Sequence, residues 1–108
     1  MFALVVRFEL RPEAVDAFDD LVARTLEGIR DEPGTLLYLT SRVADAPVSR
    51  VFVEVYADQD AFAAHEQYAH THRFLEEREA MVESYRVEFL DPIAGTFPDG
   101  WPGTVVQG

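Results

Sequence analysis

Residues 51–56 restrict the fold more than any other segment, because both sides of this short strand-like stretch are apolar. One side carries Val51, Val53 and Val55, and the other carries Phe52 and Tyr56 with Glu54 between them. Two helices cover only one face of a four-stranded antiparallel sheet, so the second apolar face needs another cover. Since twofold pairs are the commonest oligomers, we expect a homodimer through this sheet face. The alternative is that these side chains form ordinary surface.

Two hydrophobic periods alternate along the chain and give the order of its elements. Alternation of apolar and other residues predicts strands, and recurrence at three- and four-residue steps predicts helices. We expect strands over residues 2–10, 35–43, 49–57 and 83–90, a helix over 15–29, and a helical stretch over 58–81 that breaks near 69–71. The order β-α-β-β-α-β predicts an α+β, ferredoxin-like fold with a four-stranded antiparallel sheet.

The 108 residues have the length of one domain. All periodic segments lie within residues 1–91, whereas residues 92–108 are rich in proline and glycine. We therefore expect a folded domain over 1–91 and an irregular tail over 92–108. The large apolar residues Phe97 and Trp101 either dock this tail on a groove or belong to a disordered end.

Charge and cysteine content exclude several classes of function. Nine arginines stand against 20 acidic residues, for a net charge of −11, which repels nucleic acid and anionic membranes. The absence of cysteine removes disulfides and thiolate metal sites. The apolar start, residues 2–6, meets Arg7 too soon to be a signal or a membrane span. We expect a soluble cytoplasmic protein without nucleic-acid or membrane partners.

A set of short motifs follows in a fixed order. These are Glu32-Pro33-Gly34, Tyr38, the run Glu54 to Asp58, Ala61, Ala64-His65, His70 and Phe74. Together they resemble the antibiotic-biosynthesis-monooxygenase family over residues 2 to about 90. The resemblance implies a dimeric α+β barrel with a pocket between the sheet and the helices of each subunit.

The branches of this family differ in chemistry, so the fold does not settle function. One branch oxygenates polycyclic phenols or quinols with molecular oxygen and neither metal nor flavin. A haem-degrading branch has Trp and His on the helices where this chain has His65 and Leu75, which argues against haem. A third branch isomerises a phosphorylated autoinducer-2 sugar, and its pattern shares Tyr56. The resemblance thus implies no cofactor and a small aromatic or enol-type ligand.

His65 is the candidate catalytic base. If the helix is continuous, it lies on an inward stripe with Ala61, Tyr68, His72 and Leu75, and an imidazole is a natural base for a phenolic or enediol proton. The alternative is a core histidine bonded to the backbone. Glu54, a carboxylate within an apolar strand, either orients a histidine, pairs with Arg7 or Arg86, or lies at the dimer seam. Tyr56 completes the catalytic set.

Five further residues are candidate substrate contacts: Tyr38, Arg7, Tyr68, His70 and Phe74. The alternatives are core tyrosines, a solvated arginine and a surface histidine at the helix break. On a continuous helix neither His65 and His70 nor His70 and His72 share a face, and His65 and His72 are two turns apart, so we expect no metal site.

These residues together predict a cofactor-independent monooxygenase that oxidises a small aromatic phenol or quinol. The first alternative is an isomerase of a small sugar-like substrate, which uses the same base without oxygen. The second is a non-catalytic dimeric module that binds a small ligand.

Overall fold

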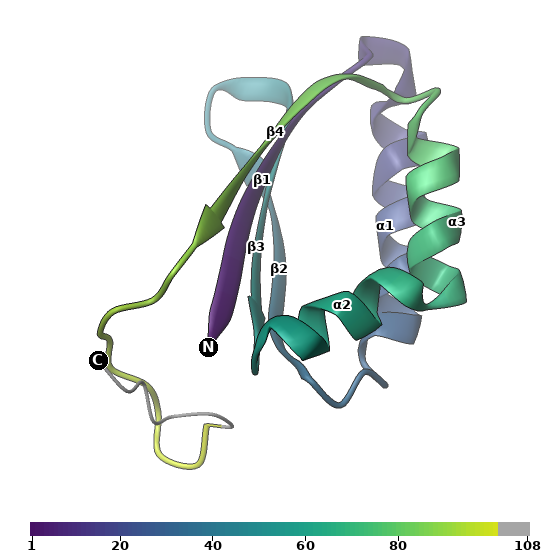
Figure 1. Ribbon diagram of the computed structural model, residues 1–108. Coiled ribbons are helices and arrows are strands. Elements are labelled where there is room, and N and C mark those ends of the chain that lie inside the picture. Colours follow the sequence, from purple (N-terminus) through teal and green to yellow (C-terminus); the bar gives the residue numbers. More distant parts are fainter. Residues whose placement is uncertain (102–108) are drawn as a thin grey trace.

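The computed structural model describes residues 1–101 and has two layers, a sheet and a layer of helices (Figure 1). In chain order the elements are β1 (Phe2–Leu10), the single turn η1 (Pro12–Ala14), α1 (Val15–Ile29), β2 (Thr35–Val43), β3 (Ala46–Tyr56), α2 (Gln59–Gln67), α3 (Ala69–Arg78) and β4 (Val82–Leu90). The strand order is β2-β3-β1-β4, and all pairings are antiparallel. The predicted α+β ferredoxin-like fold is confirmed, with its second helix split in two.

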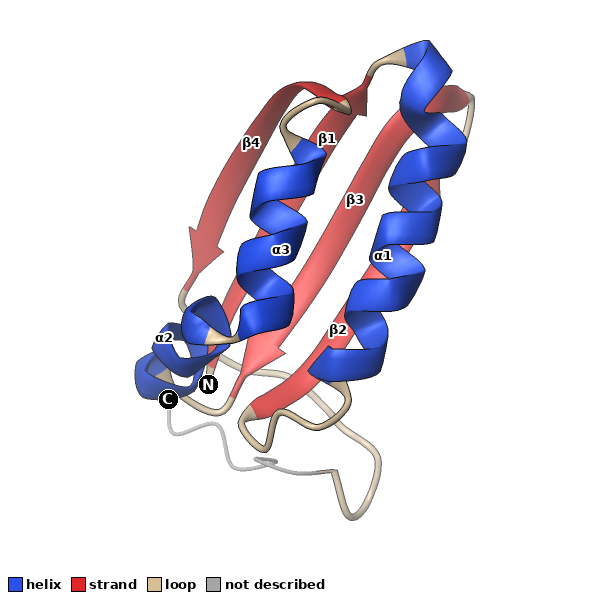
Figure 2. Cartoon of the chain, turned by 90° about the vertical axis from the view of Figure 1, so that its right-hand side faces the viewer, coloured by secondary structure: helices blue, strands red, loops and turns tan. Residues whose placement is uncertain are grey.

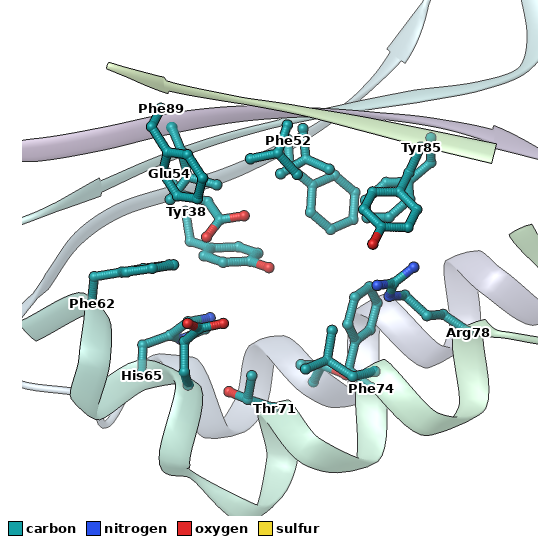
Figure 3. A pocket seen from close by; sticks show the side chains of 17 residues that line it. Tyr38, Phe52, Glu54, Phe62, His65, Thr71, Phe74, Arg78, Tyr85 and Phe89 are labelled. Atoms are coloured by element: carbon teal, nitrogen blue, oxygen red, sulfur yellow. The ribbon is translucent and has the colours of Figure 1, made fainter. Parts of the chain in front are cut away.

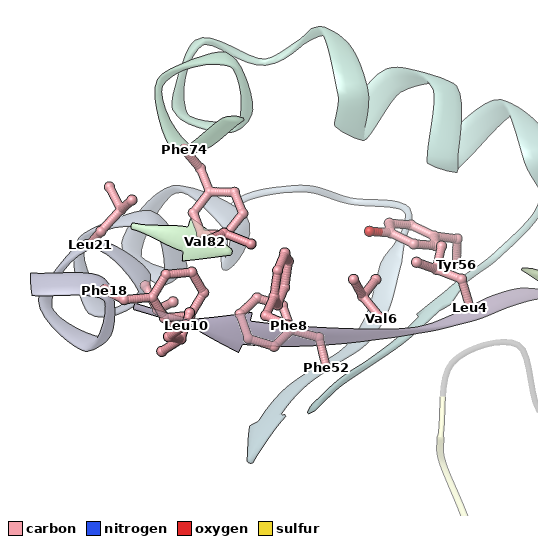
Figure 4. Packing of buried hydrophobic residues seen from close by; sticks show 11 residues of the cluster. Leu4, Val6, Phe8, Leu10, Phe18, Leu21, Phe52, Tyr56, Phe74 and Val82 are labelled. Atoms are coloured by element: carbon pink, nitrogen blue, oxygen red, sulfur yellow. The ribbon is translucent and has the colours of Figure 1, made fainter. Parts of the chain in front are cut away.

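The helices all cover the same face of the sheet (Figure 2). Alternation in β1 turns Leu4, Val6, Phe8 and Leu10 toward them, and all four are buried. Phe8 lies 5.0 Å from Phe52 and 5.4 Å from Phe18, centroid to centroid, at the centre of the core (Figure 4). Aromatic side chains of this size dominate core energetics, and removing one costs about 3–5 kcal/mol.

The β2–β3 connection is shorter than predicted. The expected strands ended at 43 and resumed at 49, but β3 begins at Ala46, which pairs with Val43. Asp45 takes the left-handed conformation, with φ 62°, that aspartate tolerates in turns. Pro47 fits into the strand because β1 pairs with β3 only from Ser49 onward, so the missing N–H has no ladder partner there.

The helical layer breaks at Tyr68, whose backbone is extended (φ −68°, ψ 147°). Asp58 caps α2 and accepts a 2.8 Å hydrogen bond from the Ala61 amide. The break falls just before the predicted 69–71, and α3 ends at Arg78 rather than near residue 81. Because the break changes the helical phase, the predicted inward stripe is wrong for Tyr68 and His72, which are exposed. Leu75 is 37 % exposed but still borders the space under the helices, and Thr71 and Phe74 are buried.

The opposite face of the sheet carries no helix (Figure 1). Val51, Val53 and Val55 lie on it as predicted, all half-buried, and their β2 partners Leu37 and Leu39 lie beside them. Leu39 is 50 % exposed. The dimer that would cover this face remains a prediction.

Regular structure ends at Leu90, and residues 91–101 contain neither helix nor strand. Phe97 and Trp101 stack on each other with centroids 5.8 Å apart. The rest of the predicted tail, residues 102–108, lies outside the described residues. No helix within residues 1–101 is both long and apolar enough to span a bilayer.

Candidate active site

A cavity of about 220 Å³ lies between the helix-bearing face of the sheet and the helices α2 and α3 (Figure 3). Its apolar wall is formed by Leu4, Val6, Phe8, Phe52, Phe62, Phe74, Leu75, Val87 and Phe89. Its polar lining is formed by Thr25, Tyr38, Glu54, His65, Glu66, Thr71, Arg78 and Tyr85. An apolar enclosure with a few convergent polar groups is the usual form of a small-molecule site.

His65 of α2 is held in the cavity wall by a carboxylate. Its Nδ1 lies 2.8 Å from Oε1 of Glu32, and both side chains are buried. Within the described residues, no hydrogen bond involves its Nε2. The imidazole therefore has one nitrogen bonded to Glu32 and one free nitrogen, in a side chain that lines the cavity.

Glu32 forms hydrogen bonds with two further side chains. The Thr35 hydroxyl donates to Oε1 at 2.6 Å, and Nε2 of His70 hydrogen-bonds Oε2. As a carboxylate, Glu32 only accepts, so all three partners donate. His65 then carries its proton on Nδ1, which leaves Nε2 as a lone-pair acceptor in the neutral ring.

Two local features bring both histidines to Glu32. The extended residue Tyr68 turns the chain between α2 and α3, so that His70 approaches the same carboxylate as His65. Gly28 of α1 makes room for it, because a Cβ at this position would lie only 2.6 Å from Cγ of His70. The prediction that His65 and His70 lie on different faces assumed a continuous helix. It is wrong here, because the helix is broken and both side chains contact Glu32.

Glu54 lies in the cavity wall on β3, 5 % exposed. Burial raises its pKa to about 7, although the Tyr56 hydroxyl, which donates to it at 2.5 Å, opposes the rise. Arg7 and Arg86 point to the other sheet face, so the predicted ion pair with either of them is wrong. Tyr38 is the register partner of Glu54 on β2; burial, with the nearby Glu54 charge, raises its pKa well above the usual range.

Arg78 and Tyr85 form the other end of the cavity (Figure 3). The Arg78 guanidinium lies 4.5 Å from the centroid of the Tyr85 ring and 5.6 Å from that of Phe8. Its Nε is buried and has no hydrogen-bond partner, and the same holds for Oγ1 of Thr71 on the same helix.

The structure brings together four of the eight predicted site residues. His65, Glu54, Tyr38 and Phe74 line the cavity, and Tyr56 is fully buried behind it. The other three lie outside the lining. Arg7 bonds Glu9 and Ser49 on the open sheet face, Tyr68 stacks on His70, and His70 reaches Glu32 from outside the cavity.

The sequence reasoning missed several residues of the site, among them Glu32, Thr71 and Arg78. Glu32 was noted only as part of a motif, although a glutamate beside Pro33-Gly34 in a family pattern containing two histidines was a usable signal. Arg78 was missed because the assumed continuous helix turned other residues inward. Within residues 1–101, no group of histidine and acidic side chains is arranged to hold a metal ion.

The fold and the cavity define a small ferredoxin-like α+β protein with a carboxylate-held histidine in an aromatic pocket. Residues 1–77 match the sequence profile described as antibiotic biosynthesis monooxygenase. The chain belongs to this family, as its motifs predicted.

Solved structures agree with this assignment. The crystal structure of an antibiotic biosynthesis monooxygenase superposes with a TM-score of 0.81 at 25% identity, covering 87% of this chain and 100% of that one. Rv0793 from Mycobacterium tuberculosis superposes with a TM-score of 0.83 at 24% identity, covering 89% of this chain and 98% of that one. PA3566 from Pseudomonas aeruginosa superposes with a TM-score of 0.80 at 20% identity, covering 86% of this chain and 94% of that one. The last two likenesses concern the fold alone. No curated protein matches the chain significantly.

Proposed function

We propose that this protein is a cofactor-independent monooxygenase that oxidises a small aromatic phenol or quinol. The observation that carries the proposal is the Glu32–His65 pair, in which the buried carboxylate binds Nδ1 and leaves Nε2 as the base beside the cavity. A histidine oriented in this way is the usual form of a general base acting near neutral pH.

The reaction begins when Nε2 of His65 takes the hydroxyl proton of the substrate. The electron-rich anion passes an electron to molecular oxygen, and the two radicals combine to a peroxide at a ring carbon. That carbon then loses its hydrogen as the O–O bond breaks. One oxygen atom remains as a quinone carbonyl, and the other leaves as water with two hydrogens from the substrate.

Three neighbouring groups have distinct parts in this scheme. Tyr38 keeps its proton because its pKa is raised, so it donates a hydrogen bond to the substrate oxygen. Glu54, with a pKa of about 7, passes a proton to the departing oxygen as the O–O bond breaks and regains one from the ring carbon, while the hydroxyl proton held by His65 completes the water. Tyr56 acts through Glu54, since its hydroxyl is bonded to that carboxylate.

The cavity volume limits the size of the substrate. A cavity of roughly 150 Å³ takes up benzene, and the cavity here measures about 220 Å³. A ligand of one or two fused rings fits this space, and the phenylalanines around it suit an aromatic face.

The active form in this proposal is a homodimer. The half-buried valines of β3 and the exposed Leu39 give the open sheet face an apolar centre, which a second copy of the chain would cover.

A second candidate is an isomerase that moves a proton in a small anionic enol-type ligand. Arg78 favours it, because a guanidinium in the cavity wall suits an anionic group. The base would again be His65, but the reaction would consume no oxygen.

Oxygen uptake by purified, metal-free protein tests the proposal. The panel consists of naphthols, naphthoquinols and catechols, measured with wild type, His65→Ala and His72→Ala. His72 is exposed on α3, so its removal controls for the loss of an imidazole. We expect uptake that His65→Ala lowers by roughly a hundredfold or more and that His72→Ala leaves unchanged. No uptake with any compound that binds would reject the monooxygenase in favour of the isomerase or a binding module.

A further inference from the structure

Arg78 is the last residue of α3, and its half-buried guanidinium lies at the cavity (Figure 3). It lies on the pocket side of the helix with Thr71 and Phe74, at the three- and four-residue spacing that defines one helical face. Tyr85 and Phe8 give it aromatic surfaces at 4.5 Å and 5.6 Å. Its position is therefore defined by packing.

Within residues 1–101, no carboxylate lies within 4.0 Å of this guanidinium, although acidic residues outnumber arginines by more than two to one in the chain. Arg7, Arg24, Arg50 and Arg86 each have an acidic partner. The adjacent Glu77 pairs with Arg24 instead. Arg78 also keeps a buried Nε without a hydrogen-bond partner. A half-buried cation in this state is suited to bind an anion in the cavity.

The base and the cation lie toward opposite ends of the cavity (Figure 3). His65 is on α2, next to Tyr38 at a centroid distance of 5.7 Å, whereas Arg78 is at the far end of α3 beside Tyr85. Phe52 and Phe74 are among the aromatic side chains that line the space. A ligand that satisfies both ends has an acidic hydroxyl at one end, an aromatic body, and an anionic group at the other.

We propose that Arg78 binds a carboxylate of the substrate, and that the substrate class is a hydroxylated aromatic carboxylic acid. This inference rests on the proposed function for the orientation of the hydroxyl toward His65, but the anion site stands on the contacts of Arg78. The guanidinium fork makes two parallel hydrogen bonds to a carboxylate.

The test is anaerobic calorimetric titration of the full chain with matched probes: a hydroxynaphthoate, the corresponding hydroxynaphthamide, and a small polyol phosphate. The two aromatic probes have the same shape and differ in charge. The variants are Arg78→Gln, Arg78→Lys and the control Arg73→Gln, which removes the same charge from an exposed position of the same helix.

We expect wild type to bind the hydroxynaphthoate roughly tenfold or more tightly than the amide. Arg78→Gln should remove this preference while the affinity for the amide persists, and Arg73→Gln should retain it. Arg78→Lys should keep only part of it, since an ammonium lacks the planar fork. Thermal unfolding of each variant confirms that it is folded.

Equal affinity of wild type for acid and amide overturns the proposal, and this measurement requires no variant. A preference that survives Arg78→Gln also overturns it, as does tighter binding of the polyol phosphate than of the aromatic acid. Because oxygen is absent, the result is independent of turnover. Preferential binding of the hydroxynaphthoate without oxygen uptake in a later assay would reject the monooxygenase proposal but support the anion site at Arg78.

Discussion

Tyr56 donates a 2.5 Å hydrogen bond to Glu54 from two residues along the same strand, and neither side chain reaches bulk solvent. Both point to the helix-bearing face because side chains alternate along β3. The Tyr56 hydroxyl donates its hydrogen bond to Glu54, so the two side chains act as a unit in which only Glu54 lines the cavity.

Glu54 should make the folded state less stable as the pH rises. Its native pKa, about 7, exceeds the usual 4.5, so the native state binds more protons between these values and the free energy of unfolding falls as pH rises through them. The full effect is on the order of 3 kcal/mol. Glu54→Gln should flatten this part of the profile, as measured by urea unfolding at pH values below 4.5 and above 7. Identical pH dependence in the two proteins would contradict the burial of an acid here.

Glu32→Gln should impair the base without removing it. The amide offers an N–H to Nδ1 of His65 and so favours the tautomer that places the proton on Nε2, facing the cavity. We expect oxygen uptake to fall at least tenfold, by less than in His65→Ala. The nitrogen chemical shifts of the His65 ring report the tautomer directly. An unchanged tautomer with unchanged uptake would exclude Glu32 from the mechanism.

Gly28→Ala should fail to give the stabilisation usual inside a helix. Alanine normally gains about 1 kcal/mol over glycine there, but its Cβ would displace the His70 ring from Glu32. In a His70→Ala background the obstacle is gone, and the same substitution should then stabilise by that amount. Denaturant unfolding of the four proteins of this cycle measures the coupling, and additive effects would show that the ring and the glycine are independent.

Val53→Glu should convert the proposed homodimer to a monomer. Val53 lies at the centre of the open sheet face, and a buried unpaired charge at a twofold interface is repeated in both subunits. Light scattering after gel filtration gives the mass, with Ala63→Glu on the exposed side of α2 as the control. A wild-type chain that runs as a monomer would remove the dimer from the proposal.

The sequence predicted the fold well because its strands and its long helix follow uniform periods. Alternation in residues 2–10 puts Arg7 on the other face of the strand from Leu4, Val6 and Phe8, so its absence from the cavity could have been predicted. The site was harder to predict because it depends on contacts between distant segments. Glu32 meets partners 33 and 38 residues away, and no local pattern encodes such an approach. The inward direction of Arg78 depends on the helical phase of α3, which the extended residue Tyr68 changes.

That residue, Tyr68, divides the cavity between two independently oriented helices. The segment before it carries His65, the proposed base, and the segment after it carries Thr71, Phe74 and Arg78, which line another part of the cavity. Substrate range can therefore change through substitutions in α3 while α2 keeps its sequence. An engineer seeking a new specificity would randomise these three positions and leave residues 59–67 untouched.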